Sequence, residues 1–321
     1  MTIQQIYDLA IQMGIKADPR GEGGIKDILA QTKKEYNELS EKEKKYYDKE
    51  NFVNPFSDSR ILNGDPKTKV SKVITGIDID TGEVVLTDRL NEKGEKIDLI
   101  IGHHPHGAAL AALDEVMNVQ VDLMELVGVP VNVAEFLMED RIGQVRRGVA
   151  PANHFQSVDA ARLLGIPFMV IHTIWDNLGF NFLSKHLNNK KPKTVGDVLD
   201  AIEEIPEFTE GKMRKAGPKI TLGARKNRAG KLAVGFTGGT SGSKELYEKM
   251  AQSGVGTVVE MHMNEEHFKE AKKHHLNVII SGHIASDSLG ANLFLDELEK
   301  RGIQVVPFSG LIRIKRNRKQ K

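Results

Sequence analysis

Short runs that are apolar at every position are the feature that most constrains the fold of this chain. Residues 99–101 read Leu-Ile-Ile and residues 278–280 read Val-Ile-Ile. Strands with one solvated face alternate apolar and polar residues, whereas strands covered on both faces are apolar throughout. From about residue 69 onward such runs alternate with helical patterns. We therefore expect an α/β fold with mixed sheets covered by helices.

The runs and the turns between them suggest two lobes. A Thr81-Gly82 turn between residues 70–79 and 84–87 predicts an opening hairpin. Residues 227–230 predict a second hairpin, at the end of a segment (186–230) rich in Lys, Asn and Pro that we interpret as the junction between lobes. Three parts follow: residues 1–62, 63–190 and 191–321. The remaining predicted strands are residues 97–101, 168–174, 232–236, 257–261, 277–281 and 303–308.

The first 62 residues are expected to form a helical extension. Residues 2–13 have a helical pattern that ends at Gly14, residues 19–24 form a Gly-rich turn, and a charged helix follows Ser40. Ser40 and Glu43 have the spacing of a capping box. We expect the charged helix to be a solvated surface rather than a binding device and assign no chemistry to the extension.

Composition indicates an ordinary globular protein of 321 residues. The chain is 40% hydrophobic and 28% charged, with neither an apolar run of about 20 residues nor a secretory signal. We expect a cytoplasmic protein that contacts no membrane. With 45 Lys and Arg against 44 Asp and Glu, the charge is nearly balanced, which argues against nucleic acid as the main partner.

The basic C-terminus is the exception to that balance. A frayed, solvated terminus is the interpretation we favour, although an RNA or another acidic partner stays open. The cations concerned are Arg313, Lys315, Arg316, Arg318, Lys319 and Lys321.

The absence of cysteine excludes disulfides, thiolate metal sites and cysteine nucleophiles. A metal must therefore be held by imidazole and carboxylate, a donor set that suits zinc, manganese, iron, nickel or magnesium.

Three predicted strands run directly into metal-ligand side chains. The carboxyl ends of strands in α/β sheets are where ligands bind. Two of these ends have His-x-x-x-Asp spacing, about one helical turn, so both side chains would project from the same side. The side chains are His103 and His104 after the first strand, His172 and Asp176 after the second, and His283 and Asp287 after the third.

Each of these motifs alone is common, and a hydrogen-bonded structural histidine would explain it. Their shared position at three strand ends favours a metal centre instead. The ligands exceed the need of a single four-coordinate zinc, and a carboxylate such as Asp176 can bridge, so two divalent ions are predicted. Two ions about 3.5–4 Å apart would lower the pKa of a water toward about 7 and polarise a phosphoryl or carbonyl oxygen, which indicates hydrolysis.

Two further features have alternative interpretations. Glu260, at a predicted strand end, is either a carboxylate that supports the ligands or carries protons, or an ordinary polar strand end. The loop with Gly238, Gly239, Ser241 and Gly242 either cradles an anion with its amides or only turns tightly. It has neither the Walker nor the dinucleotide spacing. We predict no site role for His106, His154, His186, His262, His267, His274 and His275.

Taken in order, these motifs resemble those of the Nif-three-like proteins, often labelled homologues of a type-two GTP cyclohydrolase I. The resemblance covers about residues 63–310 and rests on Asp-Leu-Ile-Ile-x-His-His-Pro, His-Thr-x-x-Asp, Gly-Gly-x-Ser-Gly and a late Gly-His-x-x-x-acid motif. It implies a two-lobed α/β fold, a dinuclear metal site in the cleft and a ring-shaped homohexamer. Here the motifs are residues 98–105, 172–176, 238–242 and 282–287.

The family pattern implies which side chains bind the ions. Asp287 stands where the family usually has glutamate, so a bridging role for this shorter side chain would need a closer backbone. The implied ligands are His103, His104, Asp176, His283 and Asp287, with His172 as a ligand or a supporting partner.

Two functions are compatible with these features. The first is a metal-dependent hydrolase of a small phosphorylated or nucleotide-like substrate; the cyclohydrolase label is not supported by the residues alone. The second is a metal-binding protein without turnover, which stores metal or forms a ring-shaped scaffold for protein or nucleic-acid partners.

Overall fold

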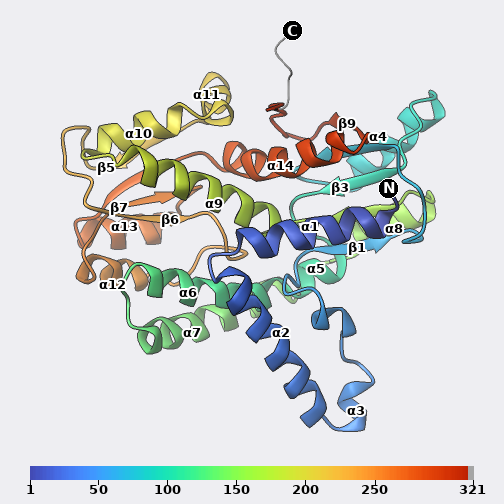
Figure 1. Cartoon of the computed structure of the whole chain (residues 1–321), viewed down its shortest axis with the longest axis horizontal. Helices are drawn as coiled ribbons and strands as arrows, with labels where there is room; N and C mark the ends of the chain where they lie inside the picture. Colours follow the sequence, from blue (N-terminus) through green and yellow to red (C-terminus); the bar gives the residue numbers. More distant parts are fainter. Residues whose placement is uncertain (317–321) are drawn as a thin grey trace.

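Two mixed β-sheets form the framework of the computed structural model, which describes residues 1–316 (Figure 1). In each sheet one edge strand is antiparallel and the other strands are parallel. The first sheet has the order β1 (Arg60–Asn63), β4 (Phe168–Val170), β3 (Leu99–Gly102), β2 (Lys72–Gly76) and β9 (Gln304–Pro307). The second has the order β5 (Lys219–Leu222), β8 (Asn277–Ile280), β7 (Val255–Glu260) and β6 (Lys231–Gly235).

Helices cover both faces of both sheets, so the predicted α/β class is confirmed. In the first sheet Val73 and Leu99 point into one core and Ile74 and Ile100 into the opposite one. The helices of the first sheet's faces are α1 (Ile3–Ala17), α9 (Thr173–Lys190) and α14 (His283–Lys300) on one side and α4 (Thr81–Glu92), α5 (Gly107–Ala111) and α8 (Gln156–Leu163) on the other.

The second sheet is enclosed in the same manner. Val259 and Ile279 point into one core, and Val258 and Val278 into the other. One core contains α9, α14, α10 (Val195–Glu203) and α11 (Pro206–Met213); the other contains the 3-10 helix η2 (Leu113–Asn118), α6 (Val119–Leu126), α7 (Val131–Val149), α12 (Leu246–Gln252) and α13 (Glu265–Lys273).

Helices α9 and α14 are shared by both sheets. The start of α9 packs on the first sheet through Trp175, and its later part packs on the second through Leu183. Helix α14 does the reverse, with Leu289 on the second sheet and Phe294 on the first. The two helices cross closely, because a Cβ atom on Gly290 would lie 1.9 Å from the carbonyl oxygen of Trp175.

The N-terminal extension is partly core. Helix α1 runs through the predicted stop at Gly14, whose missing Cβ would lie 2.9 Å from Ile174, and it buries Ile3 and Ile6. Helix α2 (Gly21–Glu38) begins inside the predicted turn, buries only Ile25 and projects from the body (Figure 1). The capping box at Ser40 is confirmed in α3 (Glu41–Lys44), which the 3-10 helix η1 (Lys49–Phe52) follows.

Both predicted hairpins are wrong. At Thr81-Gly82 the chain enters α4, because Asp80 and Glu83 form a capping box, and β2 pairs with β3 and β9. At residues 227–230 the flanking strands β5 and β6 pair with other strands, and the turn instead hydrogen-bonds to residues 193–195. The strands therefore pair with strands that are distant in the sequence and not with the neighbouring segments that the turn signals suggested.

Residues 313–316 of the C-terminal segment are held against the body of the protein by ion pairs. Arg313 lies 2.6 Å from Asp296, and Arg316 donates to Glu207 over 2.7 Å, both on buried carboxylates. The expected frayed terminus is therefore wrong for residues 313–316. The cations Arg318, Lys319 and Lys321 lie outside the described residues.

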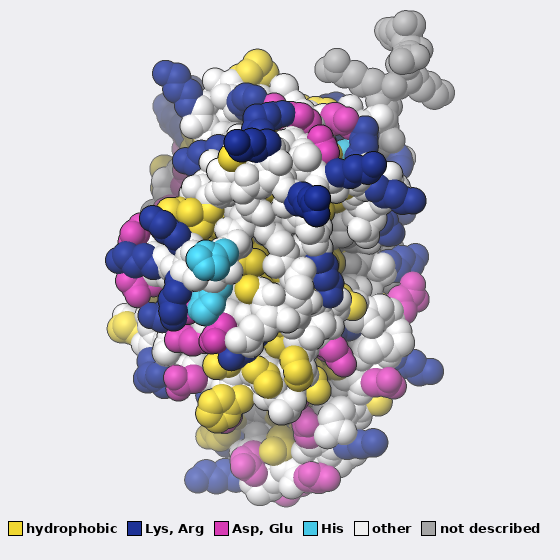
Figure 2. Space-filling view, turned by 90° about the vertical axis from the view of Figure 1, so that its left-hand side faces the viewer, with side chains coloured by type: hydrophobic (Ala, Val, Ile, Leu, Met, Phe, Trp, Pro, Cys, Tyr) yellow, Lys and Arg dark blue, Asp and Glu magenta, His cyan; other side chains and the backbone are white. Residues whose placement is uncertain are grey.

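No helix within residues 1–316 combines the length and the apolar character needed to cross a bilayer. On the face shown in Figure 2, basic and acidic side chains are interspersed.

The division of the chain at residues 62 and 190 stays a prediction. Strand β9, near the C-terminus, belongs to the first sheet rather than to the second.

The helix crossing yields a stability prediction. Replacing Gly290 by Ala should lower the free energy of unfolding by about 1–3 kcal/mol, because the new methyl group overpacks the contact with α9. The matched control is Gly148→Ala, in α7 with nothing within 4 Å, which should be neutral or stabilising by up to about 1 kcal/mol. Urea denaturation of both variants measures this; equal effects would contradict the crossing.

Candidate metal centre

Strand β3 delivers two adjacent histidines to one edge of the first sheet. The amide of His103 donates to Gly76 over 3.0 Å, and the amide of His104 donates to Ile77 over 3.0 Å, so the pairing with β2 continues past the strand end. Gly102 is needed for close approach, since a Cβ there would lie 2.8 Å from Ile79. Both imidazoles are thereby held by backbone rather than by a mobile loop.

The two His-x-x-x-Asp motifs are at the beginnings of α9 and α14. His172 precedes the first residue of α9, and His283 is the first residue of α14. Gly282 before it has φ of +101°, a conformation that favours glycine. The motifs follow β4 and β8, which belong to different sheets, and the helix crossing brings Asp176 and Asp287 to the same place.

The six predicted side chains form one cluster. Asp287 is central, with its carboxylate oxygens 3.5–3.7 Å from the Nε2 atoms of His103, His104 and His283. Asp176 lies 3.4 Å from His103 Nε2 and 3.9 Å from His172 Nε2. Three overlapping groups have the spacing of metal ligands: His103, His104 and His172; His104, His283 and Asp287; and His103, Asp176 and Asp287.

Buried oxygens without partners indicate what this cluster can bind. Asp176 Oδ1 and both carboxylate oxygens of Asp287 accept no hydrogen bond, and Asp287 is 1% exposed. Such acceptors carry a large desolvation cost unless a cation or a donor compensates it. Imidazole nitrogens and carboxylate oxygens are also the donor set of divalent transition metals. The residues therefore fit a divalent cation.

Charge within the cluster is strongly coupled. Burial by itself disfavours a charged imidazole, yet Asp287 and Asp176 raise the pKa of His103 well above its usual range. Burial likewise opposes ionisation of Asp287, but the neighbouring imidazoles, His103 first, hold its pKa below the ordinary value. The carboxylates that attract a proton to His103 would equally attract a metal ion.

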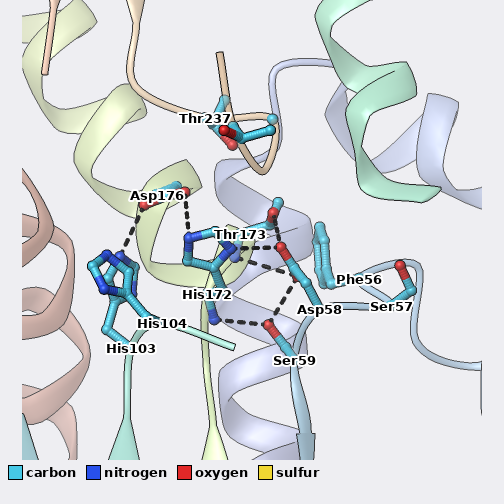
Figure 3. A network of polar contacts seen from close by, with 12 residues as sticks. Phe56, Ser57, Asp58, Ser59, His103, His104, His172, Thr173, Asp176 and Thr237 are labelled. Carbon is cyan, nitrogen blue, oxygen red and sulfur yellow. Dashed lines mark hydrogen bonds and ion pairs between the residues drawn. The ribbon is translucent and has the colours of Figure 1, made fainter. Parts of the chain in front are cut away.

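Hydrogen bonds on the outer side orient three of the imidazoles, and Figure 3 shows the one between His172 and Asp58. The Nδ1 atom of His172 donates to Asp58 over 2.8 Å, that of His104 to Asp78 over 2.6 Å, and that of His103 to the Ile171 carbonyl over 3.1 Å. Because these partners only accept, Nδ1 carries the proton and Nε2 is left to face the cluster.

Asp58 corrects the expectation that the N-terminal segment has no role in the chemistry. Its carboxylate is fully buried and also accepts from the hydroxyl of Thr173 over 2.6 Å (Figure 3). Although burial raises its pKa, the bonds from His172 and Thr173 lower the pKa below the usual range. Neither Asp58 nor Asp78 was predicted, because no spacing links them to the histidines; polar residues at the edges of apolar runs were the only signal.

The Gly-rich loop opens into the same cavity as the cluster. This cavity of about 120 Å³ is lined by His103, Asp176, Asp287 and the loop residues Gly239 to Ser243. Gly238 and Gly239 have φ of +107° and +78°, and Gln120 of α6 donates to the carbonyls of Gly238 and Thr240. The loop is thus held rigidly, as an anion cradle requires.

A polar chain ties this loop to the N-terminal extension. Thr237 donates to Asn177 over 2.6 Å, and Asn177 donates to Asp18 at the end of α1 over 3.0 Å. Asn177 is buried directly beside Asp176. The extension therefore supports both the cluster and the loop.

Glu260 also lines the cavity. Burial raises its pKa to about 8, and Tyr247 donates to it over 3.4 Å. A Cβ on Gly235 would lie 2.3 Å from its Oε2 atom, so a glycine at that position makes room for the carboxyl group. A pKa near 8 favours the protonated carboxyl group of Glu260 at neutral pH.

Of the histidines for which no site role was predicted, two lie at this cavity. His262 is exposed, and its ring centroid is 4.7 Å from that of His283; His267 donates from Nε2 to the Gly242 carbonyl over 3.0 Å. No spacing distinguished them from the others, because His262 follows its strand by two residues and His267 belongs to α13.

Comparison with known proteins assigns the fold family. No protein-family model and no curated protein matches the chain. Among solved structures, a NIF3 superfamily protein from Sphaerobacter thermophilus is 32% identical, with a TM-score of 0.71, over 79% of this chain and 92% of that one. The chain belongs to the NIF3 superfamily. The resemblance inferred from the motifs is confirmed.

More distant matches have lower scores. Reduced HcgD from Methanocaldococcus jannaschii is 13% identical with a TM-score of 0.49, covering 77% of this chain and 87% of that one. TTHA1606 from Thermus thermophilus is 17% identical with a TM-score of 0.46, covering 82% of this chain and 92% of that one.

The role of Asp58 can be tested by substitution. The substitution Asp58→Asn should weaken divalent-metal binding by about 10–100-fold, because the amide no longer selects the tautomer of His172 that presents a free Nε2. Competition with a chelator measures the affinity. The control is Ser57→Ala, whose hydroxyl donates to Ala112 and touches no histidine; an unchanged affinity in Asp58→Asn would refute the role.

The raised pKa of Glu260 predicts a pH dependence of stability. Its folded pKa of about 8 exceeds the ordinary 4.5, so the folded state binds the extra proton. The contribution of this proton to the free energy of unfolding is complete below about pH 4.5. It falls by about 1.4 kcal/mol per pH unit between about pH 4.5 and 8 and is lost above that range.

Urea unfolding of chelator-treated wild type and Glu260→Gln from pH 5 to 9 measures this effect. The stability difference between them should change by that slope and level off above about pH 8. A difference that does not vary with pH would show that Glu260 titrates normally.

Proposed function

We propose that this protein is a metal-dependent hydrolase of a small phosphorylated or nucleotide-like substrate. Two divalent ions would be held in the cluster, with zinc, manganese, iron, nickel and magnesium as candidates. The proposed ligands are His103, His104, Asp176, His283 and Asp287, with His172 as a sixth.

One observation carries the proposal. Carboxylate oxygens of Asp176 and Asp287 that accept no hydrogen bond line the same cavity as the amides of Gly239, Ser241, Gly242 and Ser243, which donate to no acceptor within residues 1–316. The first set suits cations and the second suits an anion. A site that only stored metal would need the first set alone.

The overlap of the ligand groups supports two ions. The group with His283 and the group with Asp176 have Asp287 in common, so this carboxylate would be available to both ions. Asp176, for which we expected the bridging role, belongs to one of the groups only. We therefore assign the bridge to Asp287 despite its shorter side chain.

The side chains of this protein would divide the work. When bound, divalent ions supply Lewis acidity that polarises a phosphoryl or carbonyl oxygen and acidifies water. Asp58 and Asp78 hold the imidazoles in the required tautomer. Glu260, protonated at neutral pH, donates a proton to the departing group, a role for which a pKa near the working pH is suited.

Assembly and location are further parts of the proposal. The ring-shaped homohexamer follows from the family resemblance, and the cytoplasmic location from composition. A small molecule is the proposed partner rather than nucleic acid, since Arg313, Lys315 and Arg316 are all paired with carboxylates.

The hydrolase is tested with purified protein. Metal content is measured first, and phosphomonoesters, phosphodiesters, nucleotides and cyclic amides are then assayed. His104→Ala and Asp176→Ala should lose bound metal and at least about 100-fold of the turnover, because each removes a ligand from a ligand group.

The control is Asp159→Asn, on the surface of α8, which should keep both metal and activity. Metal binding without detectable wild-type turnover would refute the hydrolase and leave the alternative, a metal store or scaffold. Unchanged metal content in both ligand variants would refute the metal centre itself.

A further inference from the structure

The Gly-rich loop is the shared wall of two hollows. Its inner side lines the cavity of the metal cluster, and Gly242, Ser243 and His267 also line an outer groove against α7. The carbonyls of the loop are engaged by Gln120, Arg141 and His267. Its amides are not: within residues 1–316, those of Gly239, Ser241, Gly242 and Ser243 donate to no protein acceptor.

Arg141 of α7 adds a positive charge to this wall. Its Nε donates to the Ser241 carbonyl over 2.9 Å, which fixes the guanidinium against the loop. It is half-buried, forms no ion pair with any described carboxylate, and has only a 3.5 Å contact from Nη1 to Gln144 besides that bond. Burial lowers its pKa, which means that its surroundings disfavour the charge.

The carboxylates nearby do not neutralise Arg141. Glu245 accepts from the Ser243 hydroxyl over 2.6 Å, and Glu266 pairs with Lys244 over 3.1 Å. Glu139 and Asp140 line the outer groove but are exposed to water. A partly desolvated arginine without a counter-ion is stabilised by binding an anion, and its planar donors match phosphate.

We infer that Arg141 and the free amides of Gly242 and Ser243, which line the outer groove together, form an anion subsite for a phosphate group of the substrate that is not the group being cleaved. That this phosphate belongs to a substrate rests on the proposed function. The substrate then carries a phosphate remote from the reacting bond, whose binding energy orients that bond toward the cluster. Once the imidazoles of the cluster bind metal, the cluster has no positively charged side chain to bind this second phosphate.

The test is the binding of inorganic phosphate to chelator-treated protein, measured by calorimetry, so that no metal can bind the anion. Wild type and Arg162→Gln, an exposed arginine of α8, should bind equally. Arg141→Gln should bind at least tenfold more weakly, and Arg141→Lys should lie between them because it keeps the charge but not the fork of donors.

A second variant separates binding from support of the loop. Gly239 has φ of +78°, so Gly239→Ala should disturb the amides while Arg141 stays in place, and phosphate affinity should fall. Equal affinities in wild type and Arg141→Gln, or no phosphate binding by chelated wild type, would overturn the subsite. If phosphate binds in an Arg141-dependent manner and no hydrolysis is found, the proposed function fails and the subsite stands.

Discussion

The close crossing of α9 and α14 is the contact on which the rest of the structure depends. Gly179 and Gly290 lie at this contact, each three residues after the aspartate of a His-x-x-x-Asp motif. Any larger residue at Gly290 would push the helices apart and separate Asp176 from Asp287. Since each helix begins at one sheet and ends on the other, the same contact also holds the two sheets together.

The buried carboxylates of the site differ in how far they are hydrogen-bonded. Carboxylate oxygens of Asp176 and Asp287 accept no hydrogen bond, whereas Asp58 accepts hydrogen bonds from His172 and Thr173. This contrast separates two tasks, since Asp58 fixes an imidazole and Asp287 is available to a cation. Leaving buried acceptors unsatisfied reduces stability, a cost that is typical of functional sites.

The N-terminal extension shows which structural features can be predicted from neighbouring residues and which cannot. Helix α1 and the capping box at Ser40 were predictable, because caps and helical periodicity are local properties. Helix α2 was not predicted, since it begins inside the segment interpreted as a turn. The contribution of the extension to the site was not predictable, since Asp58 meets His172 across 114 positions of the chain. The hairpin at Thr81 failed for a local reason: the Asp80–Glu83 capping box outweighed the turn signal of Thr81-Gly82.

By itself the sequence determined the α/β class, the strands covered on both faces and the histidines and aspartates at three strand ends. Each of these depends on residues close together in the chain, through periodicity and spacing. Only the tertiary structure decided which strands pair, that Asp287 rather than Asp176 is central, and that Asp58 and Asp78 orient imidazoles of the cluster. These depend on contacts between distant segments, which burial and the helix crossing select and no local pattern encodes.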